Sequence, residues 1–203
     1  MKSFRDIRTV YRTCGVSLLP ARRGRCQDAP MARNVEIKAR IAGVAALAPL
    51  AARLADSEPA LIDQDDTFFS CPNGRLKLRD QFAAGAELIF YQRADQSGPK
   101  ESFYLRVPVP DPTALRELLQ LAHGQTGRVR KRRLLFLVGR TRIHLDAIEG
   151  LGEFLELEVV LRDGEATEAG IVEAKDIMAR LGVTPQQLIQ GAYVDLLSEA
   201  AAG

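Results

Sequence analysis

The chain lacks the features that define several common protein classes. It contains only three cysteines, Cys14, Cys26 and Cys71, among 203 residues. Their odd number and wide spacing support neither a disulfide framework nor a zinc site, so a reducing, cytoplasmic compartment is the simplest expectation. No apolar run approaches the roughly 20 residues that a membrane-spanning helix needs, because a proline and an arginine interrupt the longest Ala/Leu stretch, residues 44–55. We therefore expect a soluble protein with no membrane partner.

The chain also lacks a marked excess of either charge. Its 28 Lys and Arg against 26 Asp and Glu give a formal net charge of +2 at pH 7. Residues 1–30 hold seven Lys/Arg and two Asp, a balance of +5, which leaves 21 basic against 24 acidic residues, or −3, for the remainder. Generic nucleic-acid binding needs a surplus of cations. We therefore expect no nucleic-acid partner.

Residues 1–30 are predicted to be separate from the folded domain. They are rich in arginine and poor in acids, and their apolar patch, residues 15–20, is too short for the apolar core of a secretory signal. The segment is either an organelle transit segment or, as the composition favours, a disordered extension or an upstream start that precedes Met31. Residues 31–203 are enough for a single domain with its own core.

From residue 31 onward the chain alternates between strand-like and helix-like stretches. Period-two alternation and turn signals predict strands over residues 35–41, 61–69, 74–79, 87–93, 100–108, 128–138, 140–148 and 154–161. Helices are expected over residues 43–55, 112–124 and 167–181, and a short last helix is expected to start at Thr184-Pro185. Strands dominate and no βαβ alternation appears. The sequence therefore predicts a mainly β, α+β fold, either an antiparallel barrel or a strongly curved sheet, with helices outside.

The polar faces of these strands carry charges that are sorted by sign. Residues two apart share a face, so Glu36 aligns with Lys38 in the first strand and Glu156 with Glu158 in the last. The strands between them carry mainly basic rows: Arg75, Lys77 and Arg79; Tyr91 and Arg93; Lys100, Ser102 and Tyr104; Lys131 and Arg133; and Arg142, His144 and Asp146. Any one such row is typical of a solvent-facing surface. Their segregation favours a tunnel in which Lys and Arg bind the phosphates of a polyphosphate and carboxylates hold a divalent metal.

In order and spacing, these motifs resemble the CYTH domain, the family of triphosphate tunnel metalloenzymes. The matching segments are residues 34–38, 75–79, 131–133, 145–158 and 191–197. The resemblance covers about residues 33–197, and residues 64–79 are most similar to the class IV adenylate cyclase-like branch. It implies an eight-stranded antiparallel barrel, open at both ends, that cleaves or cyclises triphosphate compounds with Mg²⁺ or Mn²⁺.

The resemblance also assigns roles to individual residues. The implied metal ligands are Glu36, Glu156 and Glu158, with Asp146 as a further ligand or a partner of a metal-bound water. The implied phosphate-binding residues are Lys38, Arg75, Lys77, Arg79, Lys131 and Arg133. Arg93 and Lys100 are additional candidates for phosphate binding. Arg40, Arg142 and His144 are candidates that the resemblance supports less strongly. Lys38 is the implied catalytic residue, because a lysine beside a metal-site glutamate could orient the attacking group or act as a base.

Asn34 departs from the family pattern, which usually has a glutamate at this position. An asparagine offers a carbonyl oxygen but no charge, so a second metal ion would be held more weakly.

Three functions fit the sequence: a triphosphatase acting on inorganic triphosphate, thiamine triphosphate or a nucleotide; an adenylate cyclase; and a non-catalytic polyphosphate- or nucleotide-binding module. We expect the first, because the tunnel features recognise phosphates and no adenine pocket is visible in the sequence. Family members often form homodimers, although no residue in this chain requires one.

Overall fold

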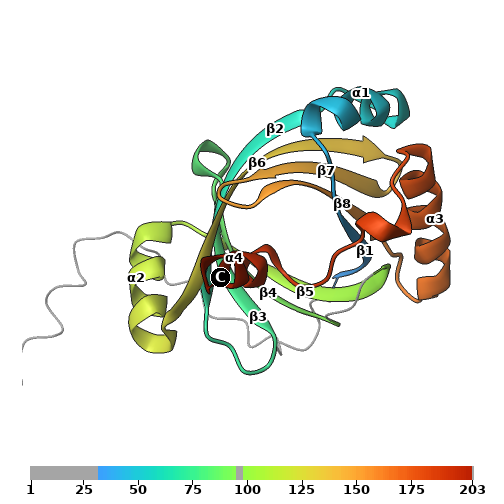
Figure 1. The fold of residues 1–203 in the computed structure, drawn as a ribbon. Coiled ribbons are helices and arrows are strands. Elements are labelled where there is room, and N and C mark those ends of the chain that lie inside the picture. Colours follow the sequence, from blue (N-terminus) through green and yellow to red (C-terminus); the bar gives the residue numbers. More distant parts are fainter. Residues whose placement is uncertain (1–31, 95–97, 203) are drawn as a thin grey trace, which may run out of the picture. The chain divides into compact units, whose positions relative to one another are not determined.

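Eight antiparallel strands close into a barrel (Figure 1). The order around the barrel is β1-β5-β4-β3-β2-β6-β7-β8, and β8 returns to pair with β1. The structure, a computed structural model, describes residues 32–94 and 98–202, so the interpretations of residues 1–30 lie outside the described residues. The fold class expected from the sequence, a mainly β antiparallel barrel with helices outside, is confirmed.

The elements follow the predicted pattern closely up to the third helix. The strands are β1 (Ala32–Arg40), β2 (Ala60–Phe69), β3 (Arg75–Asp80), β4 (Ala86–Arg93), β5 (Lys100–Val109), β6 (Gln125–Val138), β7 (Thr141–Ile148) and β8 (Gly152–Val160). The helices are α1 (Val44–Leu54), α2 (Pro112–His123), α3 (Thr167–Arg180) and α4 (Tyr193–Ala202), with 3₁₀ turns η2 (Phe82–Ala84) and η3 (Pro185–Gln187). None of the helices in this described part of the chain is long and apolar enough to cross a membrane.

The C-terminal region differs from the sequence prediction. The expected short last helix is only the turn η3, which ends because Leu188 is extended and pairs with Ala39 of β1. The amide of Ile189 then donates a hydrogen bond to the carbonyl oxygen of Lys38. A separate helix, α4, follows and packs on β6. This helix is not among the elements predicted from the sequence.

The main hydrophobic core lies outside the barrel. The strands alternate, so β1 turns Val35, Ile37 and Ala39 outward, and all three side chains are fully buried. They belong to a cluster with outward residues of β7 and β8, such as Ile143 and Leu157, beneath α1 and α3. Figure 1 shows α1 and α3 against the outer surface of the barrel. Because the apolar faces point outward, the polar faces of the same strands line the interior.

Gly127 on β6 allows α4 to approach the barrel closely. A Cβ atom built at this position would overlap Val194 Cγ2 on α4. Gly127→Ala should displace α4 and lower the free energy of unfolding by about 1–3 kcal/mol, as overpacking does. Urea denaturation measures this loss. Adding Val194→Ala to the same chain removes the opposing methyl groups and should recover part of the loss, whereas strictly additive effects would contradict this contact as the cause.

Candidate functional site

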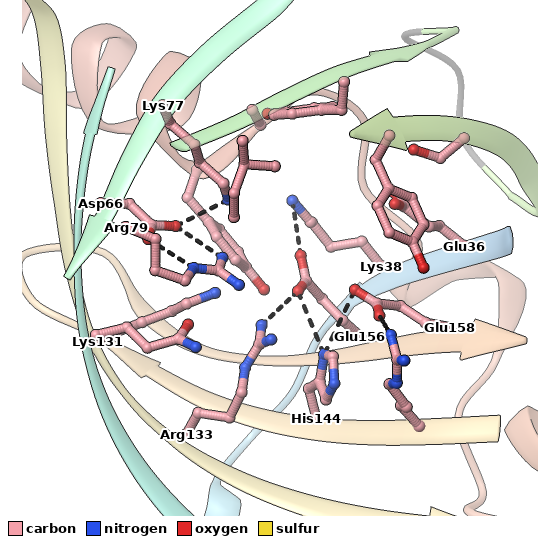
Figure 2. Close-up of a pocket in the computed structure, with 18 of the residues that line it drawn as sticks. Glu36, Lys38, Asp66, Lys77, Arg79, Lys131, Arg133, His144, Glu156 and Glu158 are labelled. Atoms are coloured by element: carbon pink, nitrogen blue, oxygen red, sulfur yellow. Dashed lines mark hydrogen bonds and ion pairs between the residues drawn. The ribbon is translucent and has the colours of Figure 1, made fainter. Parts of the chain in front are cut away.

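The interior of the barrel holds a cavity of about 350 Å³ to which every strand contributes. Most of the charged residues selected from the sequence line this cavity, namely Glu36, Lys38, Lys77, Arg79, Arg93, Lys131, Arg133, Arg142, His144, Glu156 and Glu158. Figure 2 shows the acidic group on β1 and β8 facing the basic group on β3 and β6 across the same space. The fold therefore brings the first, middle and last charged rows of the sequence together.

Four of the selected residues do not line the cavity. One of them, Arg40, donates a hydrogen bond to the Leu151 carbonyl oxygen at 3.1 Å. Arg75 donates a hydrogen bond to Asp195 on α4 at 2.7 Å. Lys100 is buried on β5, with its Cα opposite that of Glu36. Asp146 is fully buried next to the cavity wall. These residues adjoin the lining without forming part of it.

Glu156 lies at the centre of the acidic side of the cavity. Its carboxylate is 3.1 Å from Lys38 Nζ and accepts a hydrogen bond from Arg133 at 2.6 Å. Burial would raise the pKa of Glu156, but the surrounding cations, Lys38 first among them, lower it well below its usual value. Glu156 is therefore ionised at neutral pH.

Lys38 is enclosed by groups from β8 and from the C-terminal segment, residues 188–195. Its ammonium lies 3.7 Å from the centre of the Tyr193 ring and donates to the Gly191 carbonyl oxygen at 3.3 Å. Burial lowers the pKa of Lys38 to about 8, with Arg93 adding to the shift and Glu156 opposing it. The C-terminal segment thus forms part of the lysine's surroundings.

His144, Glu156 and Glu158 form a group suited to a divalent metal. Their possible ligand atoms all lie within 4.8 Å of one another. His144 Nδ1 is buried without a hydrogen-bond partner among the described residues, 3.9 Å from Glu156 and 3.8 Å from Glu158. Burial and Arg133 lower the pKa of His144, so the imidazole is neutral at neutral pH. Metal ligation requires a neutral imidazole and ionised carboxylates, so these residues fit a metal.

The sequence-predicted metal ligand Glu36 has a different partner in this structure. Its carboxylate accepts a hydrogen bond from Arg93 at 2.5 Å, and the same guanidinium donates to the Gly191 carbonyl oxygen at 2.9 Å. Glu36 nevertheless lines the cavity, with its Cα opposite that of Glu158. Asn34 also faces the cavity, and its buried Oδ1 has no partner among the described residues. A neutral amide oxygen therefore stands where the family pattern has a carboxylate.

The basic side of the cavity contains an acidic residue that is not among the site residues predicted from the sequence. Asp66 on β2 is 2% exposed and lies between Lys77 and Arg79 of β3 (Figure 2). Its Oδ1 accepts from Arg79 Nε at 2.8 Å, and its Oδ2 accepts from Arg79 Nη2 and Lys77 Nζ, both at 2.9 Å. Burial lowers the pKa of Lys77 to about 7, with Arg79 adding to the shift and Asp66 opposing it.

Several polar atoms around the cavity have no partner within the protein. Buried polar atoms normally form hydrogen bonds. Among the described residues, the buried side-chain atoms that lack one are Asn34 Oδ1, Gln64 Oε1, Arg93 Nε, His144 Nδ1 and Tyr193 Oη. All of these residues line this one cavity. This clustering of unpaired polar atoms around one cavity is expected of a binding site for a polar ligand.

A closed antiparallel barrel with oppositely charged walls inside defines a tunnel-barrel protein. The model of the CYTH domain matches residues 32–193, most of the chain. The chain belongs to the CYTH family.

The relatives support this assignment over nearly the whole domain. Adenylate cyclase CyaB of Aeromonas hydrophila is 26% identical over 177 residues, which cover 82% of this chain and 90% of that protein. The structure of PH1012 from Pyrococcus horikoshii OT3 has a TM-score of 0.70 at 23% identity and covers 81% of this chain and 99% of its own. The structure of HpAC1 from Hippeastrum, a protein with a dominant triphosphatase activity, has a TM-score of 0.58 at 15% identity and covers 82% of this chain and 95% of its own. The two structural likenesses show a shared fold.

Because Asp66 is held in ion pairs, the free energy of unfolding should depend on pH in the acid range. Burial would raise the pKa of Asp66, but Arg79 and Lys77 lower it well below its usual value. The resulting stabilisation is fully present above the unfolded-state pKa of about 3.9 and is lost as the pH falls towards the folded-state value. The free energy of unfolding should therefore drop by about 1–2 kcal/mol between pH 4 and pH 2.5 through this group.

Urea denaturation between pH 6 and pH 2.5 measures this drop. Asp66→Asn removes the titrating carboxyl group, so this variant should be less stable at pH 6 and should lose less stability on acidification. An equal loss in the native chain and in the variant would show that other carboxyl groups control acid unfolding.

Proposed function

We propose that this protein is a divalent-metal-dependent enzyme that hydrolyses inorganic or organic triphosphate compounds inside the barrel. The observation that supports the proposal most directly is the pairing of a basic wall with an acidic, metal-compatible wall across one enclosed cavity (Figure 2). A triphosphate carries several negative charges in a row. A wall of Lys and Arg binds its oxygens through charge-assisted hydrogen bonds.

The basic residues would bind and orient the phosphate chain. Lys77 and Arg79 of β3 face the cavity beside Lys131 and Arg133 of β6. The two strands flank β2, so the four cations form one continuous surface. Phosphoryl transfer requires mainly that a protein positions the substrate and stabilises its charge. This surface supplies both.

The acidic residues would hold the metal. Glu156 and Glu158 with His144 form the compact ligand group, Glu36 adds a carboxylate from β1, and Asp146 is connected to the group through Arg133. A bound Mg²⁺ or Mn²⁺ would neutralise charge on the phosphoryl oxygens. Hard cations of this kind prefer oxygen ligands.

Lys38 is the candidate catalytic residue. It lines the cavity 3.1 Å from Glu156, in the wall opposite the basic surface. From this position its ammonium can donate to the attacking group or to a phosphoryl oxygen. Its contacts with Glu156, Gly191 and the Tyr193 ring hold that ammonium in place.

A second candidate activity is the cyclisation of ATP to cyclic AMP and pyrophosphate. The observation in its favour is the similarity to adenylate cyclase CyaB over 82% of this chain. In that reaction the ribose 3′-hydroxyl replaces water as the attacking group, while the phosphates and metal need the same surroundings. Chemistry can differ on one scaffold, so the products must be measured.

The first test is a product assay on the full chain with Glu156→Gln. Native protein with Mg²⁺ or Mn²⁺ should release phosphate from inorganic triphosphate or from ATP. The variant should lose about 10²-fold or more in kcat, because it removes a charge from the metal group without changing its shape. Glu149→Gln is the matched control, since the Glu149 side chain is 70% exposed outside the cavity, and it should retain native activity.

The products distinguish the candidate activities. Pyrophosphate formed in equal amounts with cyclic AMP would identify a cyclase. Triphosphate binding without any product would identify a non-catalytic binding module. If Glu149→Gln and Glu156→Gln lost activity equally, the assignment of Glu156 to the site would be wrong.

Asn34 provides a separate test of the metal site. Its side chain faces the cavity and its Oδ1 is buried without a partner among the described residues. Asn34→Glu adds a carboxylate at that point and should lower the metal concentration needed for half-maximal activity by about tenfold, because ligand charge strengthens divalent-cation binding. Metal titration at saturating triphosphate measures this value. An unchanged titration would show that position 34 does not contribute to metal binding.

A further inference from the structure

Two carboxylates in the barrel wall hold a lysine and an arginine in the same way. On one side, Asp66 Oδ1 accepts from Arg79 Nε, and Oδ2 accepts from Arg79 Nη2 and Lys77 Nζ. On the other side, Asp146 Oδ1 accepts from Arg133 Nε, and Oδ2 accepts from Arg133 Nη2 and Lys131 Nζ. The lysine precedes the arginine by two residues on each strand. The wall therefore contains the same Asp-Lys-Arg unit twice.

The two units occupy equivalent places around the barrel. Asp66 lies on β2 and pairs with cations of β3, and Asp146 lies on β7 and pairs with cations of β6. Strands β3, β2, β6 and β7 are consecutive neighbours. In both units the aspartate is almost completely buried. The site roles that the resemblance implies include Asp146 but none for Asp66.

The geometry of the Asp66 unit leaves donors for a ligand. An arginine guanidinium has five N–H donors and a lysine ammonium has three. Asp66 takes two donors from Arg79 and one from Lys77. Both cations line the cavity, and their remaining N–H groups are available to phosphoryl oxygens.

We infer that Asp66 is a positioning residue for triphosphate binding, which fixes the Arg79 guanidinium and the Lys77 ammonium in the orientation that meets the phosphate chain. This role rests on the proposed function. The Nε and Nη2 edge of the guanidinium is tied to β2, so the opposite edge is held towards the cavity. Without Asp66, two neighbouring buried cations would repel each other and take up other side-chain orientations.

The charges around Lys77 make this role measurable. Asp66 of β2 is the anion beside it, and the cations facing it are Arg79 on its own strand and Lys131 of β6. The aromatic rings of Phe68 on β2 and Tyr91 of β4 each lie 5.5 Å from its Nζ. Burial and the two cations lower the pKa of Lys77 to about 7, and Asp66 opposes them. Removing the charge of Asp66 must therefore lower that pKa further.

The experiment measures the affinity of the full chain for inorganic triphosphate with Mg²⁺ between pH 5.5 and pH 8.5, as KM or by calorimetry. In the native chain, affinity should fall as the pH rises through the titration of Lys77, because the neutral amine no longer attracts the anion. In Asp66→Asn this fall should occur about one pH unit lower. The ionisation of triphosphate itself is common to both proteins and cancels in the comparison.

Lys77→Arg is the control that identifies the titrating group. Arginine stays protonated throughout this range, so adding Lys77→Arg both to the native chain and to the Asp66→Asn variant should remove the difference in pH dependence between the two. A folded Asp66→Asn protein with the native pH midpoint would overturn the inference. If the ion pair served stability alone and Lys77 did not meet the phosphate, Asp66→Asn would lower the melting temperature without moving this midpoint.

Asp66→Glu keeps the test decisive if Asp66→Asn does not fold. The longer side chain retains the charge but moves the carboxylate, so the pH midpoint should stay near the native value while KM rises about fivefold or more. A native KM in Asp66→Glu would contradict positioning by Asp66. If the native chain neither bound nor hydrolysed triphosphate at any pH, the proposed function would fail, and this inference would fail with it. That outcome differs from an active enzyme whose pH midpoint does not change in Asp66→Asn, which would contradict this inference alone.

Discussion

The structure depends on the pairing of charges that the barrel encloses. An ionised group removed from water is costly unless opposite charges and hydrogen bonds replace its hydration. Inside this barrel Glu156 lies between Lys38 and Arg133, Glu36 accepts from Arg93, and Asp66 binds Lys77 and Arg79. The apolar faces of the same strands are turned outward under α1 and α3. The barrel is therefore stabilised from outside, and its interior is available for charge.

This constraint explains why acids are present on a wall that binds phosphate. Lys77, Arg79, Lys131 and Arg133 are close neighbours on β3 and β6. Burial and the neighbouring cations lower the pKa of Lys77, and a neutral amine is a poor phosphate ligand. Asp66 and Asp146 offset this repulsion from within the wall. They occupy only part of the hydrogen-bonding capacity of the cations, so the wall stays charged and still has donors to offer.

The strands and the sorted charges were predictable because both are local. A period of two along each strand is enough to place Glu36, Lys38, Glu156 and Glu158 on interior faces, and the structure places all of them around the cavity. The resemblance to the CYTH domain supplied the strand number and the closure, which no local pattern contains. The positions of Arg75, Lys100 and Asp146 beside the lining could not be predicted in this way. Alternation shows which face of a strand a side chain is on, but not whether that side chain reaches the cavity.

The contribution of Asp66 could not be read from its strand. Residues 63–66 are all polar, so alternation does not distinguish the two faces of β2 there. The register decides it: Asp65 pairs with Arg128 on β6, whereas Asp66 lies with Arg79 beside the cavity. Ion pairs that skip a strand depend on the strand order, which alternation along one strand does not give either. Arg93 on β4 reaches Glu36 on β1, and Arg133 on β6 reaches Glu156 on β8.

The C-terminal segment, residues 188–195, contacts the site at one mouth of the barrel. It meets the end of β1 at Lys38 and the beginning of β3 at Arg75, and antiparallel strands bring those ends to the same mouth. There the Gly191 carbonyl oxygen accepts from both Lys38 and Arg93, and the Tyr193 ring covers the Lys38 ammonium. A carbonyl dipole and a ring face stabilise cations without neutralising them. The segment can therefore hold Lys38 and Arg93 in position while both keep the charge that a phosphate ligand requires.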